Sequence, residues 1–106
     1  MHYNTHVPDE YSGRSGLNFY ADGMLQHDDN VGELLNKIDD LKLSKNTIVI
    51  YTSDHGDWLG DHGLILKGPM PYEGLLRVPM LVTGPGVKAG HVVDAPVSTL
   101  DIAATF

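Results

Sequence analysis

The spacing of apolar residues along the chain predicts one long helix followed by a buried strand. From about residue 17 to residue 43, apolar positions recur every three or four residues, as in an amphipathic helix. Two interior glycines, Gly23 and Gly32, weaken the prediction for its first half, because each costs about 1 kcal/mol relative to alanine. A continuous β-branched and aromatic run at residues 47–52 then has the pattern of a strand buried on both faces.

A second run of the same kind covers residues 78–83, and 25 residues separate the two runs. That separation is too long for a hairpin and long enough for a crossover, so we expect the two strands to be parallel. Residues 1–16 are polar and rich in Gly, Pro and Ser, which indicates a loop. The final "STLDIAATF" is expected to begin a helix with Ser98 or Thr99 as its cap. Together these elements predict an α/β fold.

Composition excludes several classes of function. With 106 residues, the chain forms at most one domain. A net charge of -7 without a basic cluster argues against nucleic acid or an anionic membrane as partner. The absence of cysteine excludes disulfides and thiol nucleophiles within these residues but leaves the compartment open. No apolar run reaches the length of a membrane span, and no stretch has the form of a signal peptide.

The candidate chemistry lies in two Asp-His-Gly sequences. The first, Asp54-His55-Gly56, directly follows the first strand, and open α/β sheets bind ligands at such strand ends. A carboxylate beside an imidazole suits a metal ion or an acid-base pair, and Gly56 allows a sharp turn. A turn cap at Asp54 and a half-buried His55 explain the dipeptide equally well. The second copy, at residues 61–63, is followed by Lys67.

The order of motifs in "TIVIYTSDHGDWLGDHGLILKGPMPYEGLLRVPMLVTGPG" resembles the sulfatase family of the alkaline-phosphatase-like superfamily. There, a buried strand ends in Ser-Asp-(Asn or His)-Gly and is followed by Leu-Gly-Asp-His-Gly, a lysine, Tyr-Glu, Arg-Val-Pro and Gly-Pro-Gly. "QHDDNVGELLNKIDDL" and "NTHVPDEYSG" resemble the family's preceding helix and His-x-Pro loop, and "PVSTLDIAATF" resembles the next helix. The resemblance covers essentially the whole chain. It implies part of a mixed, mainly parallel sheet flanked by helices.

The resemblance also implies roles for four residues. Asp54 and His55 correspond to the pair that completes a divalent-metal site, usually calcium. Many members have Asn at position 55, and the softer imidazole of His55 also admits Mn²⁺ or Zn²⁺. Lys67 corresponds to the lysine that binds the sulfate oxygens, and His6 to a histidine that hydrogen-bonds sulfate or protonates the leaving alcohol. A solvated surface lysine and an ordinary loop histidine are the alternatives for these last two.

The second Asp-His-Gly corresponds to a supporting element in the family. Asp61 and His62 are therefore expected to hold the loop that carries Lys67 toward the site. A rival interpretation joins them with Asp54 and His55 into one compact metal site.

The nucleophile of the family has no counterpart in this sequence. Sulfatases oxidise the Cys or Ser of a Cys/Ser-x-Pro-x-Arg motif to formylglycine, but no serine here has proline two residues on. We therefore expect residues 1–106 to be an internal piece of a sulfatase catalytic domain, with the nucleophile outside them. The expected partner is a sulfate ester, and exposed sheet edges favour self-association. The alternatives are a phosphonate or phosphate ester hydrolase of the same superfamily, and an inactive fragment or binding module.

Overall fold

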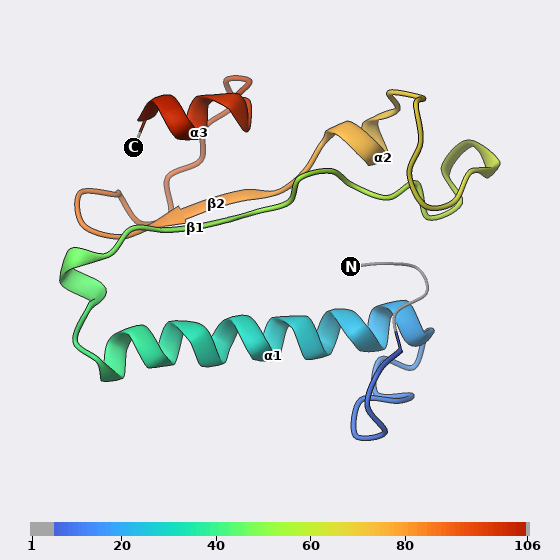
Figure 1. Cartoon of the computed structure of the whole chain (residues 1–106), viewed down its shortest axis with the longest axis horizontal. Helices are drawn as coiled ribbons and strands as arrows, with labels where there is room; N and C mark the ends of the chain where they lie inside the picture. Colours follow the sequence, from blue (N-terminus) through green and yellow to red (C-terminus); the bar gives the residue numbers. More distant parts are fainter. Residues whose placement is uncertain (1–5, 106) are drawn as a thin grey trace.

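The long helix predicted from the sequence is the largest element of the structure (Figure 1). The computed structural model describes residues 6–105, and α1 spans Phe19–Asp40, somewhat shorter than the predicted 17–43. The side chain of Asn18 caps it by accepting a hydrogen bond of 3.0 Å from the amide three residues on. The helix continues through both interior glycines, so its first half forms as well. A 3₁₀ turn, η1 (Ser44–Asn46), then leads into the first strand.

The two predicted strands pair with each other, but in the direction opposite to the one expected. β1 (Val49–Thr52) and β2 (Met80–Thr83) are antiparallel, and the first residue of each strand pairs with the last of the other. A parallel pair needs a connection that carries the chain back along the whole strand. The connecting residues, all of them described, contain only the 3₁₀ turn η2 (Asp61–Gly63) and the one-turn helix α2 (Glu73–Leu76). The chain therefore folds at the end of β1 and enters β2 from that same end.

The last helix begins where the sequence predicted. α3 spans Leu100–Thr105, and the hydroxyl of Ser98 accepts a hydrogen bond of 3.2 Å from the Leu100 amide. In return, the carboxylate of Asp101 accepts one of 3.0 Å from the Ser98 amide. This reciprocal arrangement satisfies two backbone donors at the helix start, as in a capping box. Phe106 of the predicted helix lies outside the described residues.

Residues 6–16 form the turn-rich loop that the sequence predicted, while residues 1–5 of that prediction lie outside the described part. A buried carboxylate joins this loop to α1. Asp22 is 4% exposed and accepts hydrogen bonds from the amides of Gly13 at 2.8 Å and Ser15 at 2.7 Å. Hydrogen bonds from Ser15, and then from Gly13, lower the pKa of Asp22, so the carboxylate remains ionised.

The strand pair lies between α1 on one side and α3 on the other in Figure 1. A hydrogen bond of 3.1 Å between Nε2 of His27 and the hydroxyl of Tyr51 links α1 to β1. The radius of gyration is 16.3 Å, against about 13 Å for a compact domain of about 100 residues. Within residues 6–105, none of the helices combines the length and hydrophobicity that crossing a membrane requires.

The apolar faces of these elements remain largely open. Leu34, on the predicted apolar stripe of α1, is 66% exposed, and most of β2 is exposed too. The buried apolar side chains among the described residues are few: Val7, Trp58 and Leu75. The described residues therefore do not enclose an extended core of their own.

Purified alone, residues 1–106 are expected to self-associate or to fold only in part. Each strand has one edge without a strand partner among the described residues, and such edges template pairing with other chains. Analytical ultracentrifugation and a thermal melt followed by circular dichroism test this expectation. A monodisperse monomer with a cooperative melt would contradict it.

Candidate functional site

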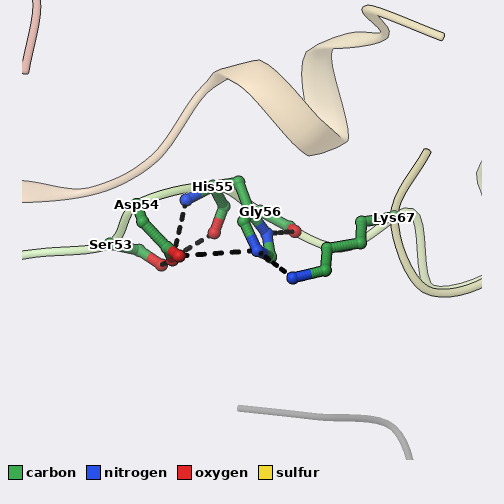
Figure 2. Close-up of polar contacts among 5 residues, drawn as sticks. All are labelled: Ser53, Asp54, His55, Gly56 and Lys67. Atoms are coloured by element: carbon green, nitrogen blue, oxygen red, sulfur yellow. Dashed lines mark hydrogen bonds and ion pairs between the residues drawn. The ribbon is translucent and has the colours of Figure 1, made fainter. Parts of the chain in front are cut away.

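The first Asp-His-Gly lies in an irregular segment directly after β1, with a bend at Asp54 (Figure 2). The hydroxyl of Ser53 donates to the carbonyl oxygen of His55 at 2.7 Å. Oδ1 of Asp54 accepts from the His55 amide at 3.0 Å. That amide hydrogen bond is the main cause that lowers the pKa of Asp54, whose side chain is 84% exposed. This segment thus presents an ionised carboxylate to solvent.

The imidazole of His55 is held in one tautomer by its neighbours. Nδ1 lies 2.7 Å from the carbonyl oxygen of Gly56, and because a carbonyl only accepts, Nδ1 carries the proton. In a neutral ring, Nε2 then has a free lone pair. That lone pair accepts a hydrogen bond from Nζ of Lys67 at 2.9 Å, and Nε2 lies 3.6 Å from Oδ2 of Asp54. Figure 2 shows these side chains converging. His55 therefore lies between a carboxylate and an ammonium group.

Lys67 reaches this position because the loop before it closes on itself. The amide of Trp58 donates to the carbonyl oxygen of Leu66 at 3.1 Å, and that of Gly60 donates to Leu64 at 2.7 Å. Because of these two hydrogen bonds, the chain has already turned back toward the end of β1 when it reaches Lys67. The structure thus brings together three of the four predicted site residues.

His6, the fourth predicted residue, begins the described chain and is exposed. None of the contacts described for residues 6–105 joins it to Asp54, His55 or Lys67. Its role stays a prediction.

The second Asp-His-Gly makes its contacts away from the first. Nε2 of His62 lies 3.8 Å from Oδ1 of Asp61, and the His62 ring stacks on Tyr72 with 3.9 Å between the ring centroids. These contacts attach the loop to the segment before α2, which supports its interpretation as a supporting element. No group of three or more Asp, Glu, His or Cys side chains within residues 6–105 could hold a metal ion. The rival four-residue metal site is therefore not formed.

Gly56 has a role that the sequence did not reveal. Its φ is not positive, so a left-handed turn does not explain the glycine. Its amide donates to the carbonyl oxygen of Leu75 at 2.8 Å, and a Cβ on Gly56 would lie 2.0 Å from the carbonyl oxygen of Gly74. The segment after β1 thus packs directly on the backbone of α2. Only the folded chain shows this contact, because the two segments are 18 residues apart.

Asp54 and His55 fit one half of a divalent-metal site. Two donor atoms 3.6 Å apart can both contact one cation through bonds of about 2.0–2.6 Å. A carboxylate with an imidazole is a donor set that several divalent metals accept. The hydrogen bond from Lys67 to Nε2 of His55 must break before that nitrogen can bind a cation. Two ligands do not complete a coordination shell, so other residues, water or a substrate must supply the remaining ligands.

A family model and several curated relatives match this chain, and all of them are sulfatases. The family model described as Sulfatase matches residues 1–106. The extracellular sulfatase SULF-1 homolog of Drosophila melanogaster is 43% identical over 76 residues, which cover 72% of this chain and 7% of that protein. The choline-sulfatase of Rhizobium meliloti (strain 1021) is 36% identical over 104 residues, covering 97% of this chain and 20% of the relative.

Human arylsulfatase K is 41% identical over 88 residues, covering 83% of this chain and 16% of that protein. The chain thus spans between 7% and 20% of the length of these curated relatives. The search of solved structures gave no significant match.

Proposed function

The chain belongs to the sulfatase family, and on that premise we propose that the protein containing it is a sulfuric ester hydrolase. Family membership implies an α/β fold of the alkaline-phosphatase type. The observation that carries the proposal is the convergence of Asp54, His55 and Lys67 at the end of β1. The names of the relatives support hydrolysis of a sulfate ester as the reaction class. Because the hypothesis is an arylsulfatase-like enzyme, an aryl sulfate is the first substrate to test.

In this proposal, Asp54 and His55 contribute two ligands to a divalent metal ion, a general requirement of the family. Ca²⁺ is the expected ion, and Mn²⁺ or Zn²⁺ is the alternative because imidazole is a softer ligand than an amide oxygen. When bound, the ion supplies positive charge against the negative charge of a sulfate group. The hydrogen bond from the Ser53 hydroxyl to the His55 backbone and the carbonyl oxygen of Gly56 orient the two ligands in advance.

Lys67 binds the sulfate group in this proposal. Its exposed ammonium lies 2.9 Å from a neutral acceptor, Nε2 of His55. A sulfate oxygen is a charged acceptor and therefore a stronger partner for the ammonium. As the S–O bond breaks, the same positive charge stabilises the negative charge that develops on the oxygens.

The proposed site has two further participants. His6 hydrogen-bonds a sulfate oxygen or protonates the leaving alcohol. The formylglycine nucleophile is supplied by residues outside 1–106.

Lys67→Ala in the full-length protein is expected to lower kcat/KM for an aryl sulfate about 10²–10³-fold, the usual loss when one charge-stabilising donor is removed. Metal content, measured by plasma mass spectrometry, should not change, because Lys67 is not a ligand. Lys88→Ala, which removes an exposed lysine from the loop after β2, is the matched control. Normal turnover by Lys67→Ala would refute the assignment. A preference of the wild-type protein for a phosphodiester over an aryl sulfate would favour the phosphonate or phosphate hydrolase instead.

A further inference from the structure

Trp58 contacts both sequence neighbours of Lys67, and its side chain has no role in the site as described above. Its side chain is among the few buried ones, at 7% exposed. Its amide donates to the carbonyl oxygen of Leu66 at 3.1 Å. Its ring covers Gly68, where a Cβ would lie 2.7 Å from Cη2 and 3.2 Å from Cζ3 of the indole. One residue thus restrains the backbone immediately before and immediately after Lys67.

We propose that Trp58 is a positioning residue for Lys67, an inference that rests on the proposed function of that lysine. A lysine side chain is long and flexible, and the Lys67 side chain is exposed, so apart from the hydrogen bond to His55 the position of the ammonium depends on the Lys67 backbone. The Trp58 ring sets the direction in which Lys67 leaves the loop toward His55. Displacing a binding group by about 1 Å can cost about 10²-fold in rate, so this restraint matters for turnover.

The contact requires the volume of the indole and not its N–H group. Nε1 of Trp58 is buried and has no hydrogen-bond partner among the described residues. A phenyl ring lacks this unpaired donor, but it also lacks the Cη2 and Cζ3 atoms that face Gly68. Trp58→Phe is therefore expected to loosen the position of Lys67 in part, and Trp58→Ala is expected to lose it.

A double-mutant cycle in the full-length protein tests the inference, with kcat/KM for an aryl sulfate and bound metal as readouts. Trp58→Ala should lower kcat/KM about 10–100-fold at unchanged metal content, and Trp58→Phe should lower it by a smaller factor. Added to Lys67→Ala, Trp58→Ala should cause no further loss, because the residue through which it acts is already gone.

The outcomes separate this inference from the function on which it rests. If Trp58→Ala lowers kcat/KM by the same factor with and without Lys67, Trp58 supports only the fold, and the inference is overturned while the function stands. If Lys67→Ala alone has no effect, the proposed function of Lys67 fails, and the inference fails with it.

If Trp58→Ala does not fold, Gly68→Ala tests the same contact between Gly68 and the Trp58 ring. Its new methyl group would push against the indole, so kcat/KM should fall as in Trp58→Ala. Adding Trp58→Phe to Gly68→Ala should restore activity, because the new methyl group then occupies the space that the missing Cη2 and Cζ3 atoms leave. Lack of restoration would overturn the inference.

Discussion

Asp54→Ala in the full-length protein is expected to abolish bound metal and sulfate-ester hydrolysis together. The Asp54 carboxylate is ionised because hydrogen bonding lowers its pKa, and its side chain is 84% exposed, so it is available to a cation. Its removal takes away the negative charge of the proposed ligand pair and leaves the neutral imidazole of His55. Hard divalent cations depend on carboxylate oxygens, so the ion should be lost. Plasma mass spectrometry after dialysis and kcat/KM for an aryl sulfate measure the two effects.

Two variants separate the metal effect from a general disturbance of the site. Asp54→Asn keeps an oxygen that can accept from the His55 amide but removes the charge, so it should retain the bend and still bind metal weakly. Lys67→Ala should lose turnover and keep the metal. An Asp54→Ala protein with full metal content and near-normal turnover would show that Asp54 is not a ligand. Metal-dependent turnover by the wild type would exclude the alternative of an inactive fragment or binding module.

The helices and the presence of two strands could be predicted because their signals are local. The apolar periodicity of α1 and the reciprocal cap of Ser98 and Asp101 lie within a few residues of the elements they define. The direction of the strand pair depends instead on the path of the 27 residues from Ser53 to Pro79. Their number allowed a crossover, but they form a loop that folds back on itself, and the number of residues carries no information about that path.

The site shows the same division between local and long-range information. The position of Asp54 and His55 after a strand makes them candidates for ligand binding, and only the resemblance to sulfatases assigns them to a metal. The contact of His55 with Lys67 depends on the loop hydrogen bonds that begin at Trp58, and no local sequence pattern predicts those hydrogen bonds. The need for glycine at position 56 was attributed to a turn, whereas it comes from close packing on α2. Contacts of this kind follow from the three-dimensional path of the chain.

Gly56→Ala is expected to disrupt the site although it leaves every proposed ligand in place. The added Cβ would lie 2.0 Å from the carbonyl oxygen of Gly74 and 3.0 Å from its carbonyl carbon. Both are backbone atoms of a helix, so neither a side-chain rotation nor a small adjustment relieves the clash. Overpacking of this kind costs about 1–3 kcal/mol or more. The segment must move away from α2, which also breaks the hydrogen bond from the Gly56 amide to Leu75.

Gly74→Ala is the matched control, because it adds the same methyl group on the other side of the same contact. Its Cβ would lie 3.4 Å from the Asp57 carbonyl oxygen and 3.6 Å from Oδ2 of Asp61, which are ordinary contact distances. Alanine also favours a helix over glycine, so this variant should be neutral or stabilised by about 0.4–1 kcal/mol. In the full-length protein, Gly56→Ala should lower the melting temperature and reduce kcat/KM for an aryl sulfate about 10²-fold, since the shift displaces Asp54 and His55. Equal activity of the two alanine variants would mean that the close packing of this segment on α2 does not position the site.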